Sequence, residues 1–404
     1  MAPILAVKKP SLPTVPRQLK ELRARARALF PRRRQLTPFV PGNHVSVLFD
    51  GGEYFDAFIA AIESAKSYVF VEVYILASDQ TGARVAEALA KKAEAGVEVA
   101  LIYDSFGSMG VLDSSFVEAL AARGVKVEEY APVSWLNLLE AFRRRNHRKS
   151  VIVDGRIGIV GGLNVSDDYA AVADGGKGWR DTGVRVEGPA VAQLEAFFRE
   201  GWRNARARPL VSLPGSCPPF ADGYAVRFDT NEGRRDRASV RRAYLEGIVR
   251  ARSTVLLTHA YFTPDAAIIR ALRRVARRGV RVELITARTT DVKASWHVAR
   301  GLYASLLPAG VRIHEWHERV LHAKTAVIDG EWVAIGSANL NRRSLRFDLE
   351  VNAFAAGPAI GKIMDERFAI DRARSEEITL EKYRERPVWD RFLEWLFGLF
   401  RPLF

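Results

Sequence analysis

The stretch NHRKSVIVDG, residues 146–155, and its counterpart LHAKTAVIDG, residues 321–330, decide how the chain is organised. Each holds a His, a Lys two residues later and an Asp five residues after the Lys, with an apolar run between the Lys and the Asp. Residues two apart on a strand share a face, so the His and the Lys of each stretch point to one side. Two copies of this arrangement in one chain predict that both serve a single site.

The rest of the chain repeats around these stretches in a fixed order. An apolar strand-like run comes first, followed by an amphipathic helix, a Gly stop and a second strand, then by a helix and strand, the motif and a small-residue turn. The matching pairs are 67–76 with 253–262, 83–104 with 266–287, 116–130 with 301–316, and 157–164 with 333–339. So many elements recurring in order indicate an internal duplication.

Short strands that alternate with helices predict an α/β fold with a largely parallel sheet in each half. The Pro- and Gly-containing stretch at 212–223 marks the joint between the halves. A pseudo-twofold arrangement would bring the two motifs face to face. The predicted divisions are a basic N-terminal segment at 1–43, a first half at 44–212, a second half at 213–375 and an amphipathic C-terminal segment at 376–404.

Composition narrows the class of partner. The chain has 61 Lys and Arg against 47 Asp and Glu, a formal net charge of +14, which favours nucleic acid or an acidic lipid surface. The single cysteine, Cys217, excludes an intrachain disulfide and a Cys-based metal site, and fits a reducing cytosol. No apolar run reaches the roughly 18 residues that span a bilayer, and the N-terminus is a poor signal peptide. We therefore expect a soluble or peripheral protein.

The paired motifs bring together His147, Lys149, His322 and Lys324. Two neighbouring ammonium groups favour a strongly anionic ligand, which a phosphoryl group provides. One imidazole can attack phosphorus while the other protonates the leaving oxygen and then deprotonates the incoming nucleophile. These residue types do not decide which histidine takes which role, and the scheme requires neither a metal nor another cofactor.

Further polar residues accompany the motifs. Asn164 and Asn339 follow the small-residue turns and are predicted to donate to the same phosphate, with Ser337 as another donor. Asp154 and Asp329 complete the catalytic motif. Each stands one residue before the Gly of a turn, which favours a structural role over a catalytic one.

These motifs resemble the phospholipase D superfamily. Two H-x-K-x-x-x-x-D stretches with trailing GGLN and GSAN carry the resemblance. Longer segments resemble bacterial cardiolipin synthases, especially the shorter type without N-terminal transmembrane helices: HRKSVIVDGRIGIVGGLNVSDDY, WRDTGVRVEGPAV, AYFTP, RRGVRVELI and LHAKTAVIDGEWVAIGSANLNRRSL. The resemblance covers residues 44–375 and implies two repeated α/β sandwich halves with a shared active site at their interface.

The resemblance implies a two-step phosphatidyl transfer from phosphatidylglycerol that forms cardiolipin and releases glycerol. It implies His147 as the nucleophile that becomes phosphohistidine and His322 as the general acid and base. Lys149, Lys324 and the two asparagines would hold the phosphoryl oxygens.

A histidine nucleophile needs its second ring nitrogen fixed to set the tautomer. Glu350, in DLEVN at 348–352, matches the carboxylate that has this role in the family. Asp181, in WRDTG at 179–183, is the corresponding candidate in the first half.

Amphipathic segments favour a lipid over a nucleic acid. The C-terminal PVWDRFLEWLFGLFRPLF, 387–404, places Trp389, Phe392 and Phe397 on one helical stripe that is too short to span a bilayer of ~30 Å. An arginine-rich segment at 17–34 carries a narrow apolar seam. An insertion at 132–146 carries an apolar stripe that begins at Trp135 and runs into basic residues predicted to meet an anionic headgroup: Arg143, Arg144 and Arg145. These features predict a protein held on the inner face of a bacterial membrane.

Three alternatives remain open. A phospholipase D that uses water needs the same residues. A nuclease would also suit the net charge, and a lipid-binding scaffold without activity is conceivable on the same fold. The sequence does not identify the acceptor, which could be phosphatidylglycerol, phosphatidylethanolamine, an alcohol or water, and it leaves the oligomeric state undetermined.

Overall fold

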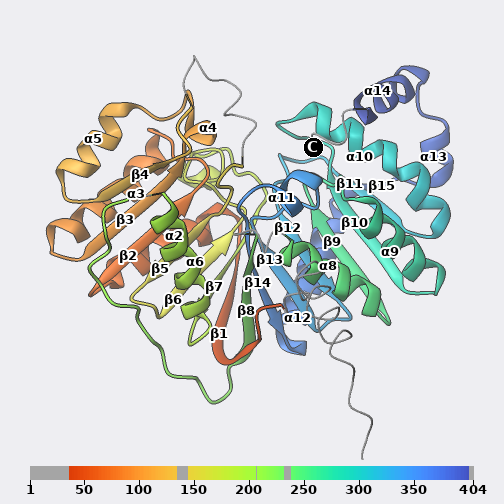
Figure 1. Ribbon diagram of the computed structural model, residues 1–404. Coiled ribbons are helices and arrows are strands. Elements are labelled where there is room, and N and C mark those ends of the chain that lie inside the picture. The colour runs from red at the N-terminus through yellow and green to blue at the C-terminus, as the bar shows by residue number, and fades with distance from the viewer. Residues whose placement is uncertain (1–35, 134–143, 206, 232–237, 400–404) are drawn as a thin grey trace, which may run out of the picture. The chain divides into compact units, whose positions relative to one another are not determined.

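The computed structural model describes residues 36–133, 144–205, 207–231 and 238–399, all within one compact unit. In this part of the chain fifteen strands join one sheet, with helices packed around it (Figure 1). The strands of the first half are β1 (Val40–Phe49), β2 (Tyr68–Val73), β3 (Glu98–Asp104), β4 (Lys126–Tyr130), β5 (Ser150–Val153), β6 (Ile157–Gly161) and β7 (Thr182–Glu187). Those of the second half are β8 (Tyr224–Thr230), β9 (Thr254–His259), β10 (Arg281–Ala287), β11 (Arg312–Trp316), β12 (Lys324–Ile328), β13 (Trp332–Gly336), β14 (Val351–Ala356) and β15 (Ser375–Glu377).

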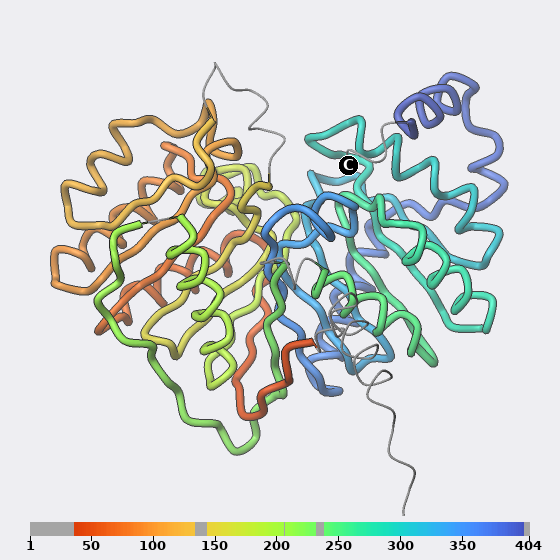
Figure 2. Tube along the Cα trace, viewed as in Figure 1, coloured from red at the N-terminus to blue at the C-terminus, as the bar shows by residue number. Residues whose placement is uncertain are grey.

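Strand order confirms the duplication. The first half runs β1-β7-β6-β5-β2-β3-β4 and the second runs β8-β14-β13-β12-β9-β10-β11-β15, joined through β1 and β8. Figure 2 follows the path of the chain through the first half and then the second. Each position in one half has its counterpart in the other, and β15 is an addition at the edge of the second.

The prediction of a largely parallel sheet is wrong. Among the described strands, only three in each half run parallel, β2-β3-β4 and β9-β10-β11. The motif strands β5 and β12 instead pair antiparallel with both neighbours. The short turn after each motif explains the pairing with the following strand: Asp154-Gly155 and Asp329-Gly330 return the chain directly as a hairpin, and a parallel pair would need a long crossover.

Helices follow the strands in the predicted order. In the first half they are α2 (Asp50–Ser64), α3 (Gln80–Glu94), α4 (Ser105–Ser108), α5 (Ser114–Ala122), the 3₁₀ turn η2 (Val172–Asp174) and α6 (Val191–Asn204). In the second they are α8 (Ser239–Arg250), α9 (Ala266–Arg277), α10 (Lys293–Leu306), the 3₁₀ turn η3 (Leu307–Ala309), α11 (Arg342–Arg346), α12 (Pro358–Ala373), α13 (Leu380–Arg384) and α14 (Val388–Gly398). Among the residues described, none of these helices is long and apolar enough to cross a bilayer.

Local sequence explains where the matching helices α3 and α9 begin and end. The Asp79 carboxylate accepts the Gly82 N–H at the start of α3, and Asp265 caps α9 in the same way. Each helix ends just before a glycine with positive φ, Gly96 at 84° and Gly279 at 91°. The predicted glycine stops are therefore confirmed in both halves.

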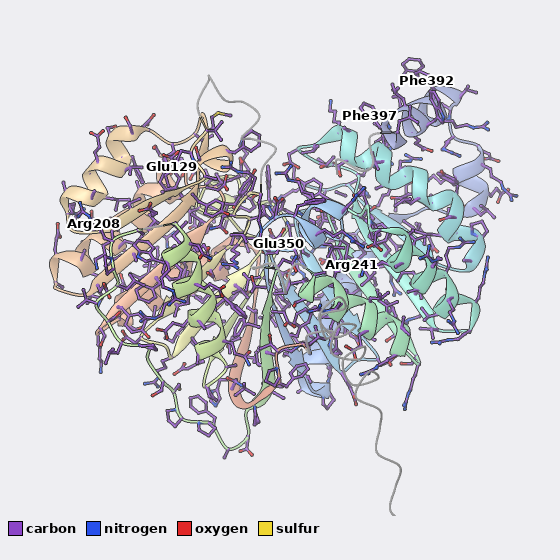
Figure 3. All side chains as sticks on the ribbon, viewed as in Figure 1. Glu129, Arg208, Arg241, Glu350, Phe392 and Phe397 are labelled. Carbon is purple, nitrogen blue, oxygen red and sulfur yellow. The ribbon has the colours of Figure 1, made fainter. Side chains whose placement is uncertain are left out.

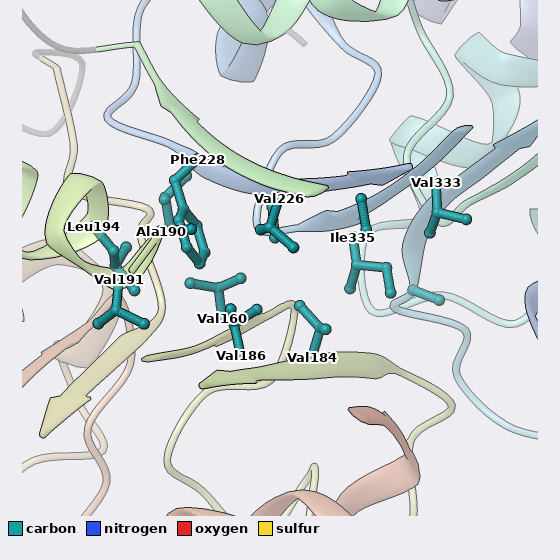
Figure 4. Packing of buried hydrophobic residues seen from close by; sticks show 14 of the residues in the cluster. Val160, Val184, Val186, Ala190, Val191, Leu194, Val226, Phe228, Val333 and Ile335 are labelled. Atoms are coloured by element: carbon teal, nitrogen blue, oxygen red, sulfur yellow. The ribbon is translucent and has the colours of Figure 1, made fainter. Parts of the chain in front are cut away.

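A shared hydrophobic core holds the two halves together. Figure 4 shows Val160 and Val184 of the first half across from Val226 and Ile335 of the second. Helices α6 and α12 add to this core, whereas α2 and α3 pack on the outer face of one half and α8 and α9 on the outer face of the other. Because inner faces of both half-sheets are buried in one core, the positions of the motif strands β5 and β12 are fixed relative to each other.

Candidate active site

The two motif histidines stand just before matching strands, and each is attached to the opposite half. The His147 N–H donates to the carbonyl of Leu349, 2.9 Å away, and the His322 N–H donates to the carbonyl of Arg180 at 2.8 Å. Leu349 belongs to the second half and Arg180 to the first. The structure therefore brings both motifs to the junction of the repeats.

The carboxylates predicted to orient the histidines are exchanged between the halves. His147 Nδ1 lies 2.9 Å from Glu350 Oε1, and His322 Nδ1 lies 2.7 Å from Asp181 Oδ2. Both carboxylates are fully buried, and Figure 3 marks Glu350 where the two halves meet. A carboxylate on Nδ1 fixes the tautomer and leaves Nε2 to react. Neither half therefore supplies both a motif histidine and the carboxylate that contacts it.

The two motif lysines are buried beside the histidines. Lys149 Nζ donates to the His147 carbonyl at 2.8 Å, and Lys324 Nζ donates to the carbonyl of His322. Burial lowers the pKa of Lys149 to about 7 and that of Lys324 to about 8. An ammonium group that burial disfavours in this way gains from a bound anion, so the pair suits a phosphodiester.

Burial also shifts the pKa of the two carboxylates and of the two histidines. It raises the pKa of Glu350 to about 8 and that of Asp181 to about 6. Burial, followed by the charge of the nearest lysine, holds the pKa of His147 and His322 well below the usual value. The imidazoles are thus neutral near neutral pH in the free site, which is the state a nucleophile requires.

The motif aspartates act on the fold. The Asp154 carboxylate accepts the backbone N–H groups of residues 66–68, where β2 begins, and Asp329 accepts those of 252–254, where β9 begins. Each aspartate has a positive φ, 52° and 53°, and stands at the opposite end of its strand from the histidine. Although they complete the catalytic motif, both residues anchor the motif strand and do not reach the histidines.

The three predicted phosphate ligands have different surroundings. The Ser337 hydroxyl donates to Glu350 and accepts the Val351 N–H at 3.0 Å, so it supports the carboxylate behind His147 instead of standing free for a phosphate. Asn164 accepts the Ile75 N–H and donates to the Tyr169 hydroxyl. Asn339 is buried, and its Oδ1 has no hydrogen-bond partner among the described residues. Phosphate binding by the two asparagines stays a prediction.

The basic residues ahead of the first motif differ from the prediction. Trp135 and Arg143 lie outside the described residues, as does the segment at 17–34. Arg145 is fully buried, with its Nη2 2.8 Å from Asp104 Oδ1, and Arg144 is half-buried and donates to the Asn231 carbonyl. The assignment of Arg145 to a lipid headgroup is therefore wrong, because a buried carboxylate already pairs with its charge.

The residues of the predicted C-terminal stripe do not all lie on one exposed face. Trp389 and Phe392 are exposed, but Phe397 stacks on His297 of α10 with 5.5 Å between ring centroids. Phe397 therefore packs against the protein, and the exposed face includes Trp395, which the predicted stripe omitted.

Aromatic rings next to the histidines escaped the sequence prediction. The Tyr74 ring meets His147 edge-on at 4.8 Å between centroids, and three rings surround His322 at 5.2 to 5.9 Å: Tyr169, Trp179 and Tyr261. In the sequence, the one feature that could have indicated their role was their position close to the motif segments, as for Tyr261 in AYFTP. Nothing in their spacing showed that they converge on one imidazole.

Comparison with known proteins gives a consistent family. The family model described as cardiolipin synthase, PLD-like domain, matches residues 58–202 and 244–372. The chain is 32% identical over 368 residues to the major cardiolipin synthase ClsA of Bacillus subtilis (strain 168), covering 90% of this chain and 76% of that protein. It is 32% identical over 370 residues to the cardiolipin synthase of Geobacillus kaustophilus (strain HTA426), covering 91% and 73%.

Solved structures share the fold. The phosphatidylserine synthase of Haemophilus influenzae Rd KW20 superposes with a TM-score of 0.69 at 12% identity, over 94% of this chain and 99% of that one. The polyphosphate kinase of Porphyromonas gingivalis gives 0.53 at 14% identity, over 86% of this chain and 56% of that one. At these identities the likeness concerns architecture alone.

Proposed function

Because the chain belongs to the phospholipase D-like cardiolipin synthase family, we propose that it joins two molecules of phosphatidylglycerol, forming cardiolipin and releasing glycerol. The observation that carries the proposal is the crossed pairing of His147 with Glu350 and of His322 with Asp181. It gives two imidazoles with fixed tautomers, and two lysines beside them, in one place. This set meets the needs of transfer through a covalent phosphohistidine.

In the first step, Nε2 of His147 attacks the phosphorus of phosphatidylglycerol. A P–N bond forms while the P–O bond to the glycerol headgroup breaks, and His322 gives the leaving oxygen a proton. The bound phosphodiester anion favours the protonated form of His322 by charge attraction, which offsets the low pKa of the free site. The products are phosphatidyl-His147 and glycerol.

In the second step, a glycerol hydroxyl of another phosphatidylglycerol takes the place of the departed glycerol. His322, now neutral, accepts the proton of that hydroxyl as its oxygen attacks phosphorus. The P–N bond breaks and returns its electron pair to His147, and cardiolipin leaves. Lys149 and Lys324 stabilise the negative charge on the phosphoryl oxygens in both steps.

The proposed partner is anionic phosphatidylglycerol in the inner leaflet of a bacterial membrane. A net charge of +14 favours such a surface over a neutral one, since each basic residue near an anionic leaflet contributes about 1 kcal/mol. The protein would act there as a peripheral enzyme.

Mass spectrometry of lipids tests the proposal. Purified protein is incubated with phosphatidylglycerol vesicles, with and without phosphatidylethanolamine, and we expect cardiolipin and glycerol from phosphatidylglycerol alone. Phosphatidic acid as the sole product would show that water is the acceptor and would contradict the transferase. Absence of lipid turnover together with cleavage of single-stranded or duplex DNA would replace the proposal with a nuclease.

A further inference from the structure

Helix α14 has one face packed on the protein. The Glu394 carboxylate is buried, 2.8 Å from Arg386 Nη2 and 3.5 Å from Nε of Arg300 in α10. One turn further along α14, Phe397 stacks on His297 of α10. These contacts fix the orientation of α14 and therefore determine which side chains point away from the protein.

The opposite face of α14 is a row of large apolar side chains in water. Trp389 is 65% exposed, Trp395 61% and Phe392 42%, and Leu399 continues the row. Ring centroids are 5.3 Å apart for Trp389 and Phe392 and 5.9 Å for Phe392 and Trp395, so the rings form a continuous surface. Figure 3 shows Phe392 on the outer side of α14 and Phe397 nearer to α10. A contiguous apolar surface of this kind marks an interaction site.

This face lies at the end of the sheet where the histidines stand. Helix α10, on which α14 packs, begins at Lys293, and Asp291 just before it accepts a hydrogen bond from the Tyr261 hydroxyl. The Tyr261 ring in turn meets His322 edge-on at 5.8 Å. Figure 1 places α10 and α14 at that end, together with α4 and α11.

Two further exposed aromatic residues occur at the same end, one in each half. Phe106 follows β3 and lies 5.8 Å from the guanidinium of Arg145, two residues ahead of His147. Phe347 is 52% exposed and precedes Glu350 by three residues. One exposed aromatic residue is therefore associated with each member of the His147–Glu350 pair.

We infer that Trp389, Phe392 and Trp395 of α14, Leu399 directly after this helix, and Phe106 and Phe347 form a docking face for a bilayer that contains anionic phospholipid. The inference rests on the proposed function, because a membrane lipid substrate requires the histidines to face the bilayer. Tryptophan prefers the bilayer interface, where its ring is apolar and its N–H stays wet. Exposed arginines accompany the rings, Arg391 on α14 and Arg342 beside Phe347.

The length of α14 fixes how it would bind. Its 11 residues extend about 16 Å as a helix, far less than the ~30 Å of a bilayer core. With one face held by α10, the helix lies in the plane of the interface and buries only its outer row. The docked enzyme then receives both lipid substrates from the membrane without lifting them into water.

Vesicle flotation of the full chain tests the docking face. We compare the wild type with the triple variant W389S/F392S/W395S on vesicles of phosphatidylglycerol and phosphatidylcholine in equal parts. We expect at least about tenfold weaker binding by the triple variant, and weaker wild-type binding to pure phosphatidylcholine.

The matched control is V211S/L213S, which removes two side chains that are 82% and 83% exposed. Val211 donates its N–H to Glu98 at the start of β3, the end of the sheet away from the histidines, so this variant should bind like the wild type.

A conservative variant guards against a folding defect in the triple mutant. W389F/W395F keeps the apolar row and should bind vesicles normally, but it should lose most of the quenching that brominated lipids cause in the wild type. Triple-variant binding equal to the wild type, or quenching unchanged in W389F/W395F, would overturn the inference. A change in oligomeric state of the triple variant with unchanged vesicle binding would also overturn it, in favour of a second copy of the chain.

Activity separates this inference from the proposed function. With dispersed short-chain phosphatidylglycerol below its micelle concentration, the triple variant should match the wild type, while its turnover of vesicles should fall with binding. Wild-type protein that binds vesicles through α14 but forms no cardiolipin would contradict the proposed function and leave the docking face intact.

Discussion

The two motif histidines have nearly the same sequence around them and different surroundings. The His147 side chain is 14% exposed, and among the described residues one aromatic ring contacts it, that of Tyr74. The His322 side chain is 5% exposed and is enclosed by three rings. Both histidines are largely buried, and His147 is the more exposed of the two. In our account the more exposed histidine attacks the phosphorus of a bulky lipid, and the more enclosed one moves a proton to and from the small headgroup oxygen.

The carboxylates that contact the two histidines, Glu350 and Asp181, also differ in their surroundings and in their pKa. Glu350 is held by the Ser337 hydroxyl, and burial raises its pKa to about 8. Asp181 accepts the Thr182 N–H at 2.7 Å, and burial raises its pKa only to about 6. Asp181 therefore remains the stronger negative charge at neutral pH and suits a histidine that must carry a proton.

Replacing either histidine should have the largest effect. We expect H147A and H322A each to lower cardiolipin formation by at least about 10³-fold, because one removes the nucleophile and the other the proton donor. The two variants should differ with phosphatidyl-4-nitrophenol, whose leaving group needs no proton. Stopped-flow absorbance should show a burst of nitrophenolate from H322A and none from H147A; the reverse pattern would exchange the two roles.

Replacing Glu350 and Asp181 by amides tests the crossed pairing itself. We expect E350Q and D181N each to reduce turnover by about 10²-fold, since an amide no longer fixes the tautomer. E350Q should slow the nitrophenolate burst, and D181N should spare it and slow turnover of phosphatidylglycerol. A suitable control is D229N, which alters a buried carboxylate paired with Arg227 and leaves both histidine pairs in place. Equal effects of E350Q and D181N on the burst would contradict the exchange between halves.

The lysines give a pH dependence with a defined direction. Burial lowers the pKa of Lys149 to about 7 and that of Lys324 to about 8 in the free site, so attraction for the phosphodiester should fall as pH rises through that window. We expect kcat/KM to decline there. The decline in kcat should begin at higher pH, because bound phosphate raises the pKa of both ammonium groups. Steady-state rates measured across this pH range give the pH dependence of kcat and of kcat/KM. If both decline at the same pH, protonation of the lysines is not linked to substrate binding.

An ion pair between the halves supports their alignment. Arg180, adjacent to Asp181, lies 2.6 Å from Asp371 of α12, and both residues are buried. D371A leaves Arg180 without this partner and should lower the free energy of unfolding by about 3–5 kcal/mol in urea titration. On the same helix, K362A breaks an exposed pair with Glu366 and should change it by less than about 0.5 kcal/mol. Similar midpoints for the two variants would show that the buried pair does not stabilise the junction.

The smallest expected effect concerns the motif aspartates. Burial alone would raise the pKa of Asp329, but the N–H groups of residues 252–254 outweigh it and hold the pKa below the usual range. The stabilisation from Asp329 is therefore complete above the unfolded pKa of about 4 and is lost as pH falls through the lower folded value. D329A should cost about 1–3 kcal/mol of stability at pH 7 and less at pH 3, with activity of the folded fraction within a few-fold. A loss of activity comparable to that of H322A would give Asp329 a catalytic role.

Sequence patterns predicted the features that depend on local order. Repeated motifs, glycine stops and the turns after Asp154 and Asp329 all follow from residues close together in the chain. The exchange of Glu350 and Asp181 between halves depends on how two sheets pack, which no local pattern contains. Arg145 illustrates the limit. Three consecutive arginines indicate a basic surface, yet Arg145 is buried because it pairs with Asp104, a buried carboxylate 41 residues earlier in the chain.

Helix α14 shows the same limit in another form. An amphipathic pattern predicted a helix with an apolar side, and α14 confirms the helix. Its apolar side chains cover more than half of the helix circumference, however, so the pattern did not decide between the face that packs on α10 and the face in water. Tertiary contacts of Glu394 and Phe397 decide it, and they place Phe397 inside and Trp395 outside.

Identification of the covalent intermediate tests the central claim most directly. Wild-type enzyme is mixed with phosphatidylglycerol radiolabelled at the phosphate, quenched in alkaline denaturant that preserves phosphohistidine, digested and mapped by mass spectrometry. Our account predicts a phosphatidyl adduct on the peptide that contains His147, absent from H147A. An adduct on the peptide that contains His322, or cardiolipin formed with no adduct on either histidine, would contradict it.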